Sequence, residues 1–168
     1  LPIEDAYLRE QKAISAMARD TVLSSLTCQN IMPRIRALRM WGWANARQGL
    51  WIQTGNMSEK AQGYTTVGGD LCGSLSLLGN MPKTVINEML AWYYRRYQFE
   101  GLKMLLVTKA SAELAEDQED ERDLMPFPVL DACFKLFVEE RLMPIELYRK
   151  LRLAFGDEYG AEHLKEWV

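Results

Sequence analysis

Histidine and cysteine are scarce in this chain of 168 residues. The one histidine is His163, and the three cysteines, Cys28, Cys72 and Cys133, lie far apart without a Cys-x-x-Cys pair. A zinc site needs clustered Cys or His ligands, and a disulfide framework needs an even set of cysteines. The sequence predicts neither. Reduced thiols in a cytoplasmic protein are the simpler interpretation.

Long apolar runs and an excess of positive charge are also missing. The longest apolar segments, such as "MLLV" at 104–107, are far shorter than the roughly 20 residues that span a bilayer. Lysine and arginine total 20 against 23 acids, which gives a net charge of −3. A domain that binds a nucleic-acid duplex normally carries the opposite sign. We therefore expect neither a membrane nor a nucleic acid as partner.

Hydrophobic periodicity predicts helices that alternate with short strands. Helices are expected over residues 4–23, 31–49 and 82–99, and around 127–140, 144–154 and 158–167, with 26–30 interrupting helical structure between the first two. A short buried strand is expected over 50–55 and another strand over 74–79, and 102–108 is interpreted as another strand or the end of a helix. This alternation favours an α/β fold with a parallel sheet flanked by helices. Two clear strands are few for a complete sheet, so we expect this sheet to be incomplete.

A glycine-rich segment, "TGNMSEKAQGYTTVGGDL" (54–71), follows the first predicted strand and is predicted to be a loop. Parallel α/β sheets place ligands beyond the carboxyl ends of their strands, and glycines let backbone amides approach a phosphate. Glu59 and Asp70 offer oxygens of the kind that Mg²⁺ prefers, and Lys83 begins the next helix as a cation. The pattern predicts a site for an anionic nucleotide with a divalent metal. Because neither a Walker A motif nor G-x-G-x-x-G is present, a solvated turn stays open as the alternative.

Four stretches occur in a fixed order: "QNIMPRIRALRM", "TGNMSEKAQGYTTVGGD", "MPKT" and "SAELAEDQEDERDLMPFPVLD". Together they resemble the NAD synthetases, which belong to the ATP pyrophosphatase group. The resemblance covers about 28–86 and 110–131. It implies a Rossmann-like, adenine-nucleotide α-hydrolase-like fold, in which residues 1–168 form the middle and C-terminal part of one synthetase domain. The acidic run 113–123 is expected to be a solvated loop.

The resemblance also implies an activity. NAD synthetases are ligases that use ATP to convert deamido-NAD into NAD through an adenylate, with release of pyrophosphate and AMP. The implied partners are ATP, deamido-NAD, ammonia or a glutaminase domain, and a second copy of the chain in a homodimer; Mg²⁺ is the implied cofactor. Which nitrogen donor is used stays open. The family's S-G-G-x-D-S loop does not occur in this sequence, so we expect the segment alone to be inactive.

Position by position, the resemblance implies roles for eight residues. ATP-binding residues are expected at Thr54, Lys83, Ser111 and Arg34. Residues that bind deamido-NAD are expected at Asp70, Asn30 and Arg36, and the magnesium ligand at Glu59. No side chain is assigned as acid, base or nucleophile, because positioning and neutralisation of phosphate charge account for most of this chemistry.

The sequence departs from the family's pattern at four positions, of which Met57 replaces a frequent lysine and Gly68 a common aromatic residue. Pro33 stands where alanine is usual, and Ser74 stands where many members have an aspartate at the nicotinate end. Two other functions stay open at this point. One is an ATP pyrophosphatase that activates a different substrate, and the other is a nucleotide-binding module without catalysis.

Overall fold

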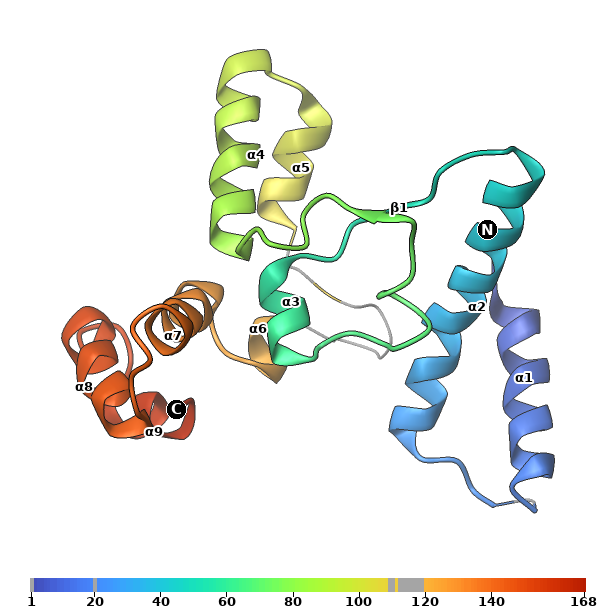
Figure 1. Cartoon of the computed structure of the whole chain (residues 1–168), viewed down its shortest axis with the longest axis horizontal. Coiled ribbons are helices and arrows are strands. Elements are labelled where there is room, and N and C mark those ends of the chain that lie inside the picture. Colours follow the sequence, from blue (N-terminus) through green and yellow to red (C-terminus); the bar gives the residue numbers. More distant parts are fainter. Residues whose placement is uncertain (1, 20, 109–110, 112–119) are drawn as a thin grey trace. The chain divides into compact units, whose positions relative to one another are not determined.

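The computed structural model describes residues 2–19, 21–108, 111 and 120–168 (Figure 1). The chain divides into two compact units. The first is built on the residues up to Asn80, and the second on residues from Met81 onward.

The described residues of the first unit form three helices and a pair of strands. These are α1 (Glu4–Met17), α2 (Ser25–Ala46), β1 (Ile52–Gln53), α3 (Met57–Gln62) and β2 (Leu75–Ser76). α1 and α2 lie side by side (Figure 1). α2 begins six residues before the predicted start because the Ser24 side chain accepts the N–H of Thr27, as a helix N-cap does. The prediction that 26–30 interrupts helical structure was therefore wrong.

The two strands form a parallel pair, with Ile52 opposite Leu75 and Gln53 opposite Ser76. The predicted parallel sheet is confirmed, although each strand is shorter than predicted. β1 is also not the fully buried strand that we expected, because Ile52 is 45% exposed. The buried position of β1 holds a polar side chain, that of Gln53.

α3 lies inside the glycine-rich segment, which was predicted to be a loop throughout. The Asn56 side chain accepts the N–H of Glu59, while the Glu59 carboxylate accepts the N–H of Asn56. This reciprocal pair is a capping box, which satisfies backbone donors at the start of a helix. Gly63 ends the helix in the left-handed region, with φ of 72°. The loop prediction was wrong for these six residues.

In its described part, the regular elements of the second unit are all helices. Its helices are α4 (Lys83–Tyr97), α5 (Glu100–Val107), α6 (Asp120–Asp123), α7 (Phe127–Val138), α8 (Pro144–Phe155) and α9 (Ala161–Glu166). α4 and α5 lie side by side, and α7 contacts both α4 and α8 (Figure 1). The segment 102–108 is therefore helical rather than a strand. Most of the predicted acidic loop lies outside the described residues, and its last four residues form α6.

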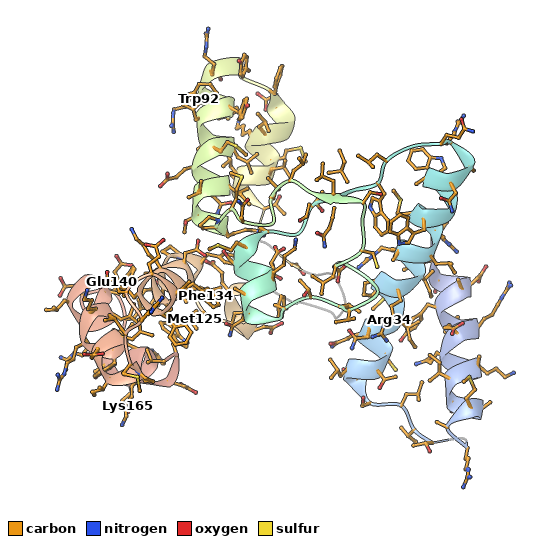
Figure 2. The ribbon with its side chains drawn as sticks, viewed as in Figure 1. Arg34, Trp92, Met125, Phe134, Glu140 and Lys165 are labelled. Carbon is orange, nitrogen blue, oxygen red and sulfur yellow. The ribbon has the colours of Figure 1, made fainter. Side chains whose placement is uncertain are left out.

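The apolar core of the second unit lies among α7, α8 and α9. Four aliphatic side chains there are at most 1% exposed: Val129, Leu130, Leu151 and Leu164. Met125, just before α7, and Phe134, on α7, border this core (Figure 2). The three helices predicted for this region are confirmed. In the part of the chain that the structure describes, no helix combines the length and apolarity needed to cross a bilayer.

Candidate functional site

A polar network joins the segment after α3 to helix α2. Thr66 is its centre: its hydroxyl donates to Asn30 Oδ1 at 2.8 Å, and its N–H donates to Asp70 Oδ2 at 3.3 Å. Asp70 Oδ1 in turn lies 4.0 Å from an Nη atom of Arg36. The three residues that the resemblance assigns to deamido-NAD, namely Asn30, Arg36 and Asp70, are thus brought together. Thr66, which links them, is buried and was missed by the sequence reasoning.

Arg34 contributes a further contact from the same helix (Figure 2). Its Nε donates to the carbonyl oxygen of Val67 at 3.1 Å. Val67 precedes Gly68, which adopts a φ of 77°, a conformation that favours glycine. Arg34 and Arg36 therefore both contact the segment that carries Asp70.

The segment approaches α2 so closely that a side chain at one position would force a neighbouring atom to shift. A Cβ on Gly69 would lie 2.8 Å from Cβ of Pro33 and 3.2 Å from Cβ of Thr66. Real Cβ contacts are essentially never as short as the first of these. The absence of a side chain at Gly69 thus lets the Asp70 carboxylate reach Thr66 and Arg36.

Thr54 and Glu59 lie just beyond the carboxyl end of β1. Thr54 directly follows the strand and is exposed, and Glu59 is in the first turn of α3 and half-buried. Glu59 Oε2 accepts the N–H of Asn56 at 3.2 Å, which fixes the carboxylate near the helix start. A carboxylate at this end of a parallel strand suits Mg²⁺, which binds proteins through one or two carboxylates and completes its shell with phosphate oxygens and water. Among the residues that the structure describes, no three His, Cys, Asp or Glu side chains gather into a metal-ligating group.

The other two predicted ATP ligands belong to the second unit. Lys83 is the first residue of α4, and its Nζ lies 5.3 Å from the centroid of the Phe127 ring, a cation–π distance. The next residue, Thr84, donates to Asp131 Oδ2 from both its N–H and its hydroxyl, at 2.9 and 2.7 Å. These contacts fix the start of α4 to α7. Ser111 is exposed and lies outside the helices.

The structure therefore sorts the predicted residues by unit. Six belong to the first unit, namely Asn30, Arg34, Arg36, Thr54, Glu59 and Asp70, and two belong to the second, Lys83 and Ser111. Four of the six, all on α2 or the segment after α3, are brought together around Thr66 and Val67. That Glu59 and Lys83 hold one Mg–ATP stays a prediction.

A second polar cluster near the strand ends was also missed by the sequence reasoning. Lys60 Nζ donates to Gln53 Oε1 at 2.8 Å and to the hydroxyl of Ser76. Gln53 Nε2 donates to the main-chain carbonyl oxygen of Asp70. The available signal was a polar residue in the otherwise apolar stretch "LWIQT" (50–54), because a buried polar side chain needs hydrogen-bond partners.

Comparison with known proteins gives a consistent result. The family model for NAD synthase matches residues 1–162. The glutamine-dependent NAD(+) synthetase of Thermotoga maritima is 32% identical over 154 residues, which is 89% of this chain and 26% of that protein. The enzyme of the same description from Aquifex aeolicus is 35% identical with the same coverage. The chain thus spans about a quarter of the length of these curated relatives.

Solved structures share the fold. A glutamine-dependent NAD(+) synthetase from Cytophaga hutchinsonii superposes with a TM-score of 0.77 at 26% identity, over 97% of this chain and 26% of the other. An NMN synthetase from Francisella tularensis superposes with a TM-score of 0.66 at 20% identity, over 96% of this chain and 62% of the other. The predicted fold class is confirmed. With a family model matched along nearly its whole length, the chain belongs to the NAD synthase family.

Proposed function

We propose that the protein containing this chain is an NAD synthetase that converts deamido-NAD and ATP into NAD, AMP and pyrophosphate. The observation that carries the proposal is the network of Asn30, Thr66, Asp70 and Arg36 in a member of this family. It presents an amide, a carboxylate and a guanidinium at one place. Such groups suit a dinucleotide, which has hydroxyl groups, ring nitrogens and phosphates to be held.

The chemistry has two steps. A nicotinate carboxylate oxygen attacks the α-phosphorus of ATP, and the bond to the bridging oxygen breaks to release pyrophosphate. Ammonia then attacks the activated carbonyl carbon, loses a proton, and AMP leaves with the oxygen. A carboxylate is a poor acyl donor, so transfer of the AMP group to one of its oxygens creates a good leaving group and makes amide formation feasible. The protein mainly has to align the reactants and balance the phosphate charge.

The roles that we propose for the side chains are those that the family resemblance implies. Asn30, Arg36 and Asp70 would hold deamido-NAD beside α2. ATP would be held by Thr54, Arg34, Lys83 and Ser111. Glu59 would bind Mg²⁺, which when bound neutralises phosphate charge. In this assignment Lys83 supplies a compact positive charge to a phosphate.

The nitrogen donor and the assembly are part of the same proposal. The relatives from Thermotoga maritima and Aquifex aeolicus are glutamine-dependent. We therefore propose that a glutaminase domain of the complete protein supplies the ammonia and that the synthetase is a homodimer. Three free cysteines are compatible with a reducing, cytoplasmic location.

The test is isotope exchange with the complete protein that contains this chain. Labelled pyrophosphate should enter ATP when deamido-NAD and Mg²⁺ are both present, and not when either is omitted. Exchange with nicotinic acid mononucleotide but not with deamido-NAD would show that the mononucleotide is the substrate. No exchange with any carboxylate would favour a non-catalytic module. Parallel reactions with ¹⁵N-labelled glutamine and ammonium would identify the nitrogen donor.

A further inference from the structure

The ammonium group of Lys60 lies where the two strands end. It donates to Gln53 Oε1 at 2.8 Å and to the hydroxyl of Ser76. Gln53 and Ser76 are partners in the sheet and are the last residues of β1 and β2. One side chain of α3 is therefore bonded to the ends of both strands.

Two glycines border this lysine, and the absence of a side chain at Gly79 makes room for it. A Cβ on Gly79 would lie 3.0 Å from Lys60 Nζ and 2.7 Å from the Ser76 hydroxyl. A Cβ on Gly55 would lie 3.4 Å from Lys60 Cε. Lys60 is half-buried, and its ammonium group is held by polar groups at the strand ends.

α3 depends on such contacts because it is short and offers few apolar side chains. It has six residues, of which only Ser58 is fully buried. The capping box fixes its first turn, but a cap does not fix the rotation of a helix about its own axis. The bonds from Lys60, together with burial of Ser58, restrict this rotation, and Lys60 directly follows Glu59 in the helix.

The same cluster also extends to the segment that carries Asp70. Gln53 accepts from Lys60 through Oε1 and donates to the Asp70 carbonyl oxygen through Nε2. The Asp70 carboxylate then accepts the N–H of Thr66 and lies near Arg36. A chain of hydrogen bonds therefore links Lys60 to the Asp70 segment.

We propose that Lys60 is a positioning residue for both ligands. It orients Glu59 toward the metal by fixing the rotation of α3, and through Gln53 it fixes Asp70 toward deamido-NAD. The assignment rests on the proposed function, because that function gives Glu59 and Asp70 their roles. Groups that orient metal ligands typically change metal affinity or activity by about 10- to 100-fold when they are removed.

The first experiment compares Lys60→Met with Lys12→Met in the complete protein. Methionine keeps much of the apolar stem of Lys60 and removes its ammonium, while Lys12 is an exposed lysine on α1. In Lys60→Met we expect the half-saturating Mg²⁺ concentration and the KM for deamido-NAD each to rise about 10-fold. Amide hydrogen exchange should accelerate in 57–62 and 66–72 but not in α7–α9. Lys12→Met should match the wild type in every measurement.

A second variant, Gln53→Glu, separates the two effects. Glutamate still accepts from Lys60, but it has no N–H to donate to the Asp70 carbonyl oxygen. We expect the KM for deamido-NAD to rise about 10-fold, while Mg²⁺ dependence stays within about twofold of the wild type. If Lys60→Met does not fold, Gln53→Glu and Ser76→Ala test the role of Lys60 instead. Each removes one hydrogen bond only, that from Gln53 to Asp70 or that from Lys60 to Ser76.

The inference is overturned if Lys60→Met keeps both constants and the exchange pattern of the wild type. It is also overturned if exchange accelerates equally in α7–α9, because the role of Lys60 is then only structural. Failure of the proposed function would look different, since the wild type itself would show no deamido-NAD-dependent exchange of pyrophosphate. In that case the amide exchange of the same variants decides whether Lys60 fixes α3 and the Asp70 segment.

Discussion

Around α7, α8 and α9 the most deeply buried side chains are aliphatic, whereas between β1 and β2 they are polar. Val129, Leu130, Leu151 and Leu164 fill the first region, and Asn56, Ser58 and Thr66 are buried in the second. Apolar burial is strong and non-directional, so it stabilises a structure without specifying where a polar group points. Hydrogen bonds are individually weaker but directional, and a connected set of them fixes one arrangement.

We infer from this contrast that the two regions have different roles. The helices α7–α9 provide stability and, through Asp131 and Phe127, a fixed base for the start of α4. The segment between β1 and β2 provides geometry for Asn30, Arg36 and Asp70. Substitutions in the first region should therefore change the free energy of unfolding, and substitutions in the second should change ligand binding.

The largest expected effect on stability is that of Leu151→Ala. Leu151 is 0% exposed in the α7–α9 core, and truncating a buried leucine costs about 3 kcal/mol. Leu153→Ala is the matched control, because Leu153 is on the same helix and 90% exposed. Urea unfolding, monitored by hydrogen exchange in α7–α9, measures the difference in free energy of unfolding between the two variants. Equal effects of the two substitutions would contradict the assignment of this core.

Gly69→Ala should have the next largest effect and should act on the polar region. The new Cβ would lie 2.8 Å from Cβ of Pro33, and overpacking of this kind costs about 1–3 kcal/mol. Gly42→Ala is the control, because its Cβ would have no neighbour within 4 Å and alanine favours a helix. Calorimetric titration with deamido-NAD should show weaker binding for Gly69→Ala only. Unchanged binding would show that the approach of the segment to α2 is not needed.

The free energy of unfolding is expected to depend on pH through Cys133, which is buried in the apolar region. Burial raises the pKa of the Cys133 thiol to about 11, from an ordinary value of 9.0. Because the thiol loses its proton more easily in the unfolded state, the protonated Cys133 stabilises the folded state fully below pH 9. This stabilisation is lost as the pH rises toward 11. By pH 10 the loss should reach about 1 kcal/mol. Cys133→Ala should remove this part of the slope in urea unfolding between pH 8 and 10, and an unchanged slope would contradict the prediction.

Arg36→Ala should have the smallest effect on stability. Its ion pair with Asp70 is 4.0 Å long and both side chains are 43% exposed, so its contribution is below about 1 kcal/mol. Deamido-NAD binding should nevertheless weaken at least about 10-fold, since Arg36 would lose a charged contact with the ligand. The salt dependence of the dissociation constant should also decrease in the variant. If Arg36→Ala keeps the wild-type dissociation constant for deamido-NAD, Arg36 does not bind this ligand.

Sequence patterns predicted the positions of helices better than they predicted side-chain contacts. Proline at the start and apolar residues at helical spacing placed α4 within two residues of its observed bounds. α3 could have been predicted as well, because Asn56 followed three residues later by Glu59 is a capping-box pattern. The short apolar run at 102–108 could not be assigned, because strands and short helices share that pattern.

The site was predictable only as a set of residues. Motif order pointed to Asn30, Arg36 and Asp70, and the structure brings them together. Thr66 and Lys60 were not predicted because their importance comes from partners 36 and 16 positions away in the chain. Such long-range pairs depend on how the segment packs against α2 and the strands, which no local pattern specifies.

The most direct test of the central claim is a structure of the complete protein with Mg²⁺, deamido-NAD and a non-hydrolysable ATP analogue. The proposal predicts that a Glu59 carboxylate oxygen coordinates the metal while Lys83 Nζ contacts a phosphate of the same nucleotide. Metal and nucleotide bound elsewhere, with Glu59 and Lys83 facing separate regions of the protein, would contradict it.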